Sequence, residues 1–349
     1  MSTSLPLLVD ETALENYLAV HLPGDVAPVV AQRLSAGHSN ETFIIRRGQE
    51  EWVLRRPPLG PLLPTAHDVI REYRFISALK DTNVPVPQPV LACEDTAVLG
   101  APFYMMEKLP GVVIRDTMPS QFANEASGHA IAEELVQTLV KLHAVDWKNT
   151  SVASVGKPEG YIARQIKRWS GQLEGAYTRP LPDLLAVGEW LKENLPESPA
   201  ASIVHGDYRI DNCMYSASPP ARVIGVLDWE MATLGDPLAD LGYVLSFWRD
   251  KGEPEAAFPR DMGYITILPG FPSRNQIIER YSELSGLRVS EASMRFYVAL
   301  AIWKLAILLE GSYKRHLSGT TDDPFFALLK EGVPALALRA LKVSKGEGV

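Results

Sequence analysis

The strongest constraint on the fold is that patterns typical of β-strands and patterns typical of helices occupy different parts of the 349-residue chain. In the first part, two runs rich in β-branched and aromatic residues flank a polar turn around Gly48, which predicts a β-hairpin over residues 42–54. Two more extended runs, at 90–93 and 103–108, follow before Gly111 breaks the chain. We therefore expect a small mixed lobe at the N-terminal end.

Beyond Gly111 the apolar residues recur with the period of a helix, except in a β-rich insert at 203–227. The predicted helices lie at residues 121–144, 160–174, 182–194, 237–248, 274–285, 291–314 and 324–342. A second, larger and mostly helical lobe is expected, joined to the first near residues 106–111.

Composition and charge limit the class of protein. The apolar share of 46% and the charged share of 22% are ordinary for a globular chain with a sizeable core. The formal net charge of −8 disfavours nucleic acid and anionic membrane surfaces as partners.

Two cysteines, Cys93 and Cys213, cannot build a disulfide framework or a cysteine cage for a metal, which favours a reducing compartment. Residues 1–10 lack a signal-peptide pattern, and the most apolar window, 296–309, is shorter than the about 20 residues that span a bilayer. A cytoplasmic protein is expected.

Three oxygen-bearing side chains stand out in the β-rich insert. Asp207 and Asn212 lie five positions apart in a glycine-containing loop, and Asp228 follows an apolar run that reads as a strand. If the two segments pair, the three side chains face one cleft. Carboxylate and amide oxygens suit Mg²⁺, which takes few protein ligands and completes its shell with water and phosphate oxygens. Each residue alone is equally typical of a turn or a helix cap, and only the combination favours a site.

The segment His205-Gly206-Asp207, with Asn212 five residues after Asp207 and an Asp at the next strand end, resembles the aminoglycoside phosphotransferase and choline kinase branch of the protein-kinase-like superfamily. The segment Gly-Asp-Pro-Leu-Ala-Asp-Leu at 235–241 matches the same family, and the resemblance covers about residues 28–315. It implies an α+β, two-lobed protein-kinase-like fold. The small N-terminal lobe, with an antiparallel sheet, would span 1–106, the hinge 107–111, and the larger, mostly helical lobe 112–349.

The resemblance also implies ATP and Mg²⁺ as cofactors and a small-molecule hydroxyl as the acceptor of the γ-phosphate. Carried over residue by residue, Asp207 is the catalytic base and Arg209 a cation near the transferred phosphate. Asn212 and Asp228 would hold Mg²⁺. Two further residues would support the loop structurally, His205 by packing within it and Asp240 by bracing it from the next helix.

In the first lobe the resemblance implies a nucleotide site. The family covers the phosphates with a loop, here 34–42, which includes Ser39 and Asn40 but lacks the Gly-x-Gly-x-x-Gly pattern. The strand position that usually holds a phosphate-binding Lys holds Arg55, and Glu72 on the following helix is its natural partner. A forked guanidinium is not equivalent to an ammonium. The alternative for Arg55 and Glu72 is a solvated surface pair.

Residues 103–111 match the family's hinge. There, Met106 would line the adenine pocket, and the backbone of Glu107 and Leu109 would bond the base. Methionines at 105 and 106 are equally compatible with ordinary core packing.

The motifs of several other enzyme classes are absent from the sequence. The chain has no Gly-x-x-x-x-Gly-Lys-Ser/Thr, no Gly-x-Ser-x-Gly and no His-Glu-x-x-His. The serious competitor is a kinase-shaped nucleotide- or ligand-binding module without catalysis, which Arg55 and the irregular phosphate loop favour.

The acceptor is indicated only indirectly. An aminoglycoside pocket should be strongly acidic, but the C-terminal helix around 291–314 mixes both charges, with Arg295, Lys304, Glu310, Lys314 and Arg315. This argues against a polycationic aminoglycoside. Residues 52–58 and 142–146 are similar to the phosphotransferase-like domains found fused to, or beside, acyl-CoA dehydrogenases. That similarity implies a hydroxyacyl-CoA or another hydroxy acid as the acceptor, and a functional link to an acyl-CoA dehydrogenase.

Overall fold

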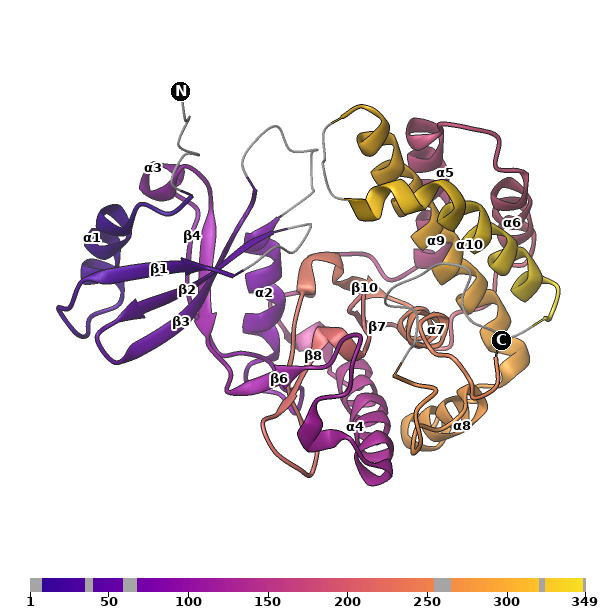
Figure 1. Cartoon of the computed structure of the whole chain (residues 1–349), viewed down its shortest axis with the longest axis horizontal. Coiled ribbons are helices and arrows are strands. Elements are labelled where there is room, and N and C mark those ends of the chain that lie inside the picture. The colour runs from indigo at the N-terminus through magenta and orange to yellow at the C-terminus, as the bar shows by residue number, and fades with distance from the viewer. Residues whose placement is uncertain (1–7, 35–39, 59–67, 254–264, 320–323, 348–349) are drawn as a thin grey trace. The chain divides into compact units, whose positions relative to one another are not determined.

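The computed structural model describes residues 8–34, 40–58, 68–253, 265–319 and 324–347 (Figure 1). The chain forms two compact units. Unit 1 comprises Met1–Pro110 and Gly225–Met231, and unit 2 comprises Gly111–Ile224 and Ala232–Val349. An antiparallel sheet with helices in unit 1 and a mostly helical unit 2 confirm the predicted α+β class. Residues 225–231, which the sequence analysis placed in the second lobe, pack with unit 1.

Unit 1 is built on a five-stranded sheet of order β1-β2-β3-β5-β4, in which every neighbouring pair is antiparallel. Its strands are β1 (Val29–Arg33), β2 (Glu41–Arg47), β3 (Glu50–Arg56), β4 (Pro89–Cys93) and β5 (Phe103–Glu107). The predicted hairpin is β2–β3. Gly48 in its turn has φ +58°, a left-handed conformation that glycine adopts without steric cost.

Helices pack on both faces of this sheet (Figure 1). They are α1 (Glu11–His21), α2 (Val69–Leu79) and α3 (Thr96–Leu99), and Asp side chains cap the start of each. Because successive strand residues point to opposite faces, Leu54 of β3 joins the α1 core while Arg55 reaches Glu72 of α2. The alternation thus places the charged residue of β3 on the α2 face.

Unit 2 contains the seven helices predicted beyond Gly111. They are α4 (Glu125–His143), α5 (Tyr161–Ala176), α6 (Pro182–Glu193), α7 (Leu238–Ser246), α8 (Arg274–Ser285), α9 (Glu291–Leu317) and α10 (Leu329–Ser344). Strands of the β-rich insert combine with β6 and β10, which lie outside it, in two small sheets, β6-β8-β9 and β7-β10. Their strands are β6 (Gly111–Val113), β7 (Ser202–Val204), β8 (Cys213–Ser216), β9 (Val223–Val226) and β10 (Thr233–Gly235).

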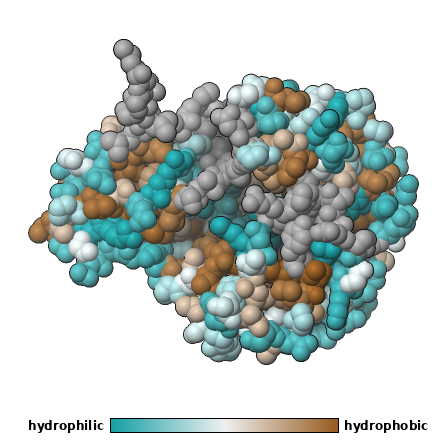
Figure 2. Space-filling model, viewed as in Figure 1, coloured by the Kyte–Doolittle hydropathy of each residue, from teal (hydrophilic) through white to brown (hydrophobic). Residues whose placement is uncertain are grey.

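Helix α9 is the central element of unit 2, since α5, α6, α7 and α10 all pack against it. Its 27 residues are long and apolar enough to cross a membrane by length and composition, with a mean hydropathy of 1.6 in the most apolar window. Within the structure, 61% of that window is buried, as in a core helix. On the face drawn in Figure 2, hydrophobic residues lie in separate groups among hydrophilic ones.

Candidate active site

The loop after β7 is held by a buried carboxylate on α7. Asp240, in the first turn of that helix, is fully buried, and its two oxygens accept the backbone N–H groups of His205 and Gly206, each at 2.7 Å. His143, at the end of α4, lies with Nε2 3.3 Å from the same carboxylate. Gly206 has φ +85°, which a side chain would disfavour. The loop backbone is therefore fixed from two helices.

The charge of Asp240 depends on these partners. Burial alone would raise the pKa of this carboxyl, but hydrogen bonds from His143 and Gly206 bring the pKa below its usual value. Asp240 is therefore ionised at neutral pH, and its negative charge is available to both N–H donors.

Asp207 and Asn212 face each other across the loop. The Asn212 Nδ2 donates to the Asp207 carbonyl oxygen at 2.7 Å and to Asp207 Oδ2 at 2.8 Å. The amide nitrogen is thus used to orient Asp207. The amide oxygen of Asn212, which no described residue contacts by a hydrogen bond, is the atom that could bind a cation.

Arg209 lies on the other side of Asp207. Its Nε is 3.6 Å from Asp207 Oδ1, and its Nη2 forms a 3.1 Å ion pair with Asp211. Burial raises the pKa of Asp211, and Arg209 opposes this shift. The sequence analysis did not assign Asp211 a role, although its place between Arg209 and Asn212 in the same motif was a signal.

Tyr243 of α7 also lies near Asp207. Burial, followed by the charge of Asp207, holds the pKa of Tyr243 well above its usual value, so the phenol remains protonated. The aromatic side chain of Tyr243 is equally compatible with core packing, so its place near Asp207 could not be predicted from the residue type alone.

In unit 1, Arg55 bridges two carboxylates. Its Nη1 is 3.3 Å from Glu72 Oε1, and its Nη2 donates to Asp228 Oδ1 at 3.0 Å. Glu72 is fully buried and Arg55 is 9% exposed, so the alternative of a solvated surface pair is wrong. The pairing with Glu72 was predicted; the pairing with Asp228 was not, because it depends on residues 225–231 packing with unit 1.

The charges of Arg55 and Glu72 respond differently to pH. Burial would lower the pKa of Arg55, but Glu72 and Asp228 raise it above its usual value, and the guanidinium stays charged. Burial raises the pKa of Glu72 to about 7, and Arg55 opposes this shift. Glu72 is therefore the member of the cluster whose charge is sensitive near neutral pH.

Asp228 itself adopts an unusual backbone conformation, with φ +64°. Left-handed backbone is uncommon for a residue with a side chain, and such conformations are concentrated at functional sites. The adjacent Trp229 N–H donates to Glu72 at 3.3 Å, which ties this turn to α2.

The phosphate-covering loop is described only in part. Ser39 lies outside the described residues. Asn40 is 4% exposed, and its Nδ2 is 3.5 Å from carboxylate oxygens of both Glu72 and Glu230. In the structure this amide faces the acidic cluster around Arg55.

The hinge residues differ in what they can offer a base. Met106 is 7% exposed within β5. The Glu107 N–H already donates to the Gln88 carbonyl at 2.8 Å. Of the Glu107 backbone groups predicted to bond a base, only the carbonyl oxygen is therefore left for that role. Leu109 lies against Gly225, so closely that a Cβ added at Gly225 would clash with Leu109 Cδ1.

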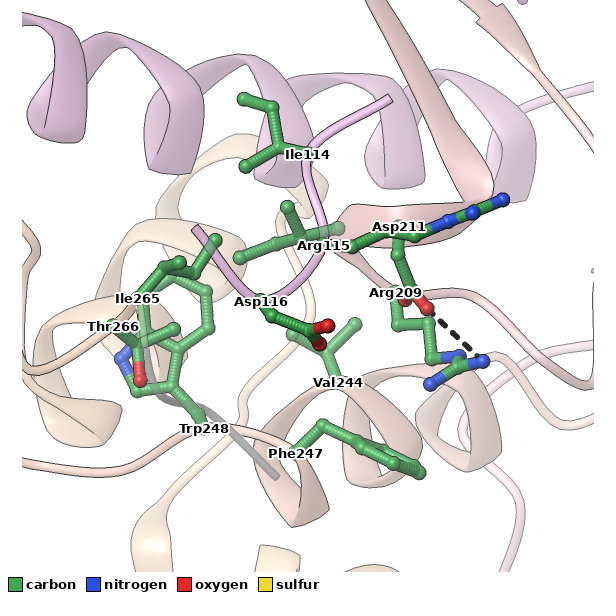
Figure 3. Close-up of a pocket in the computed structure, with 11 residues that line it drawn as sticks. Ile114, Arg115, Asp116, Arg209, Asp211, Val244, Phe247, Trp248, Ile265 and Thr266 are labelled. Carbon is green, nitrogen blue, oxygen red and sulfur yellow. Dashed lines mark ion pairs between the residues drawn. The ribbon is translucent and has the colours of Figure 1, made fainter. Parts of the chain in front are cut away.

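A pocket in unit 2 opens beside the loop that holds Asp207 (Figure 3). Arg209 lies at its edge, paired with Asp211 and placed 4.9 Å above the ring of Phe247. Its lining is mainly apolar and comprises Ile114, Arg115, Asp116, Arg209, Ile210, Asp211, Val244, Phe247, Trp248, Ile265 and Thr266. An apolar pocket with a few polar groups is the usual form of a small-molecule site.

Replacing Arg55 by lysine is expected to lower the free energy of unfolding by about 1–3 kcal/mol, because one ammonium cannot span two carboxylates that Arg55 reaches with separate nitrogens. Urea denaturation followed by tryptophan fluorescence measures this. The matched control is Arg46→Lys in β2, whose pair with Glu51 is exposed and should contribute nothing measurable. Equal effects of the two substitutions would contradict the role of the Arg55 bridge.

Residues 30–274 match the phosphotransferase enzyme family. The human acyl-CoA dehydrogenase family member 11 is 35% identical over 344 residues, which cover 96% of this chain but 43% of that protein. The chain therefore spans less than half the length of this curated relative.

Solved structures share the fold along nearly the whole chain. A protein from Ralstonia eutropha, described as a candidate aminoglycoside phosphotransferase, superposes with a TM-score of 0.81 at 31% identity, over 97% of this chain and 98% of that one. A thermostable aminoglycoside phosphotransferase in ternary complex with AMP-PNP and hygromycin B gives a TM-score of 0.60 at 16% identity, over 95% and 98%. The predicted resemblance is thus confirmed.

Proposed function

Since this chain belongs to the phosphotransferase enzyme family, we propose that it transfers the γ-phosphate of ATP to a hydroxyl group of a small molecule in a reaction that requires Mg²⁺. The observation that carries this proposal is the pair Asp207 and Asn212 on a loop whose backbone Asp240 fixes. A carboxylate held in one orientation is what alignment of an acceptor hydroxyl needs, because a loose transition state depends on positioning more than on a strong base.

The residues of the loop have distinct parts in this proposal. Asp207 accepts the hydrogen bond of the acceptor hydroxyl and takes its proton as the hydroxyl oxygen bonds to the γ-phosphorus. The bond between the γ-phosphorus and the bridging oxygen of ATP breaks in the same transfer, and ADP leaves. Asn212 holds the Asp207 carboxylate through two hydrogen bonds. Arg209 places a positive charge beside Asp207, where it can offset the negative charge of a phosphoryl group.

The side chains also suit Mg²⁺. Within the parts of the chain that the structure describes, no group of three His, Cys, Asp or Glu residues is placed to hold a metal ion. Mg²⁺ in a nucleotide site is held mainly by phosphates and by few protein oxygens. The Asn212 amide oxygen and the Asp228 carboxylate are the ligands that we assign. When bound, Mg²⁺ neutralises charge on the phosphates.

Nucleotide binding is supported by unit 1. Arg55 occupies the strand position of the family's phosphate-binding lysine and stays charged, and the aminoglycoside phosphotransferase of similar fold was solved with the ATP analogue AMP-PNP. A binding module without catalysis is the second candidate, because both terminal nitrogens of Arg55 are already engaged by carboxylates.

We assign the acceptor to hydroxy acids or hydroxyacyl-CoA thioesters, with a functional link to an acyl-CoA dehydrogenase. The support is the name of the relative that this chain matches at 35% identity.

Mg²⁺ removal tests the proposal. Incubation with ATP and a panel of hydroxyl compounds is expected to give a phosphorylated product that disappears with EDTA and returns with Mg²⁺. Asp228→Asn should raise the Mg²⁺ concentration for half-maximal rate about tenfold or more, because losing even an outer-shell partner of a metal typically costs 10–100-fold in affinity.

Asp81→Asn, an exposed carboxylate of unit 1, serves as the control and should leave the Mg²⁺ dependence unchanged. Nucleotide binding that does not depend on Mg²⁺, with no phosphate transfer to any compound, would refute the proposed enzymatic activity and favour the binding module.

A further inference from the structure

A lysine in the middle of α9 faces the helix that carries Asp240. Tyr297 lies seven residues before Lys304, so the two share one face of α9. Tyr297 packs against Gly242 of α7, where an added Cβ would come within 2.6 Å of Tyr297 Cβ, and its hydroxyl donates to Asp236 at 2.7 Å. Lys304 therefore lies on the α7 side of α9, where it is half-buried.

The ammonium of Lys304 has no ion pair and no hydrogen bond among the described residues. Its nearest recorded partner is the ring of Trp169 on α5, whose centroid is 5.5 Å from Nζ. Arg168, next to Trp169 on α5, is exposed and likewise lacks an ion pair within the described chain, and its charge is one of the causes that lower the pKa of Lys304. Two cations close together, one of them half-buried with three unused donors, are unfavourable unless an anion joins them.

The carboxylates near Lys304 do not account for its position. Asp240 already accepts two backbone N–H groups and contacts His143, and Asp207 already accepts from Asn212. Both carboxylates act on Lys304 only through space. Burial lowers the pKa of Lys304 to about 8, with Asp240 opposing the shift, so the ammonium is still mostly charged at pH 7.

We propose that Lys304, assisted by Arg168, binds a negatively charged group of the phosphate acceptor and so selects acidic hydroxyl compounds. This rests on the proposed phosphate transfer and adds a specificity residue to it. The anionic group is either the carboxylate of a hydroxy acid or a phosphate of a CoA thioester. Both present anionic oxygens to an ammonium beside the loop of Asp207.

The experiment compares full-length wild type with Lys304→Met, Lys304→Arg and the control Lys330→Met, an exposed lysine of α10. Acceptors are hydroxy acids paired with their neutral amides, and hydroxyacyl-CoA thioesters paired with the matching hydroxyacyl-pantetheines. For each, KM and kcat are measured, and binding is measured by calorimetry without ATP.

Lys304→Met should raise the KM of the preferred acidic acceptor about 10- to 100-fold, the usual effect of losing one charge-assisted hydrogen bond, with kcat and the KM of ATP little changed. Lys304→Arg should restore most of the affinity, and the neutral partner compound should be unaffected. A preference for the acid over the amide identifies a carboxylate. A preference for the thioester over the pantetheine identifies a CoA phosphate.

Stability separates this role from a structural one. The pKa of Lys304 is lowered from 10.5 to about 8 in the folded chain, so its charge disfavours folding increasingly as the pH falls from about 10.5 and fully below about 8. Lys304→Met should therefore raise Tm at pH 7. A lower Tm together with unchanged acceptor preference would overturn the inference.

Two further outcomes distinguish the role of Lys304 from the proposed function. Phosphorylation of neutral acceptors with equal efficiency in wild type and Lys304→Met would overturn the inference and leave phosphate transfer intact. Charge-selective binding that depends on residue 304, with no phosphate transfer to any compound, would uphold the anion site and refute the proposed function.

Discussion

Replacing Asp207 by alanine is expected to lower the turnover of phosphate transfer by about 10²–10⁴-fold, the range typical of losing a positioned general base. Nucleotide affinity should change little, because the side-chain partners of Asp207 are Asn212, Arg209 and Tyr243 of unit 2, whereas Arg55, proposed to bind the nucleotide, belongs to unit 1. Single-turnover measurement of product formation, with separate titration of ATP binding, distinguishes the two quantities.

A matched control for this experiment is Asp183→Ala, which removes a carboxylate from α6, away from the loop motif. It should leave turnover unchanged. Turnover of Asp207→Ala at the wild-type level would remove Asp207 from the mechanism.

Replacing Asp240 by alanine should produce the largest loss of stability of any substitution considered. The N–H groups of buried His205 and half-buried Gly206 would lose their acceptor, and His143 would lose its carboxylate. Unsatisfied buried groups cost about 1–3 kcal/mol each, so we expect the free energy of unfolding to fall by about 3–5 kcal/mol. Urea denaturation at neutral pH measures the change.

Asp240→Asn refines this test, because the amide oxygen can still accept one of the two N–H groups. Its loss of stability should lie between those of wild type and Asp240→Ala. The same Asp183→Ala variant serves as the control. A loss of less than about 1 kcal/mol for Asp240→Ala would show that solvent or a shifted loop satisfies these N–H groups.

Much of the fold follows from local patterns in the sequence. The hairpin around Gly48 and the helices beyond Gly111 were predictable because turn chemistry and apolar periodicity act over a few residues. The strand β10 was missed, since three residues carry too little pattern to be recognised without their partner β7.

The residues of the site likewise fall into those that a local motif indicates and those that depend on distant parts of the chain. Asp207, Asn212 and Asp240 could be found because they lie in two short motifs. The pairing of Arg55 with Asp228 joins residues 173 positions apart, and no local pattern encodes it. The engaged N–H of Glu107 also escaped prediction, because it depends on the register of the chain beside Gln88.

The packing of residues 225–231 with unit 1 has a consequence for dissecting the chain. A fragment cut after Pro110 would keep Arg55 but leave behind Asp228, one of its two counter-charges. It would also leave behind Trp229, whose ring stacks on Phe75 with centroids 6.5 Å apart. The packing of unit 1 is therefore completed only after residue 231 has been made, although its five-stranded sheet ends at Glu107. During synthesis, Arg55 lacks one counter-charge and Phe75 lacks its stacking partner until that segment emerges.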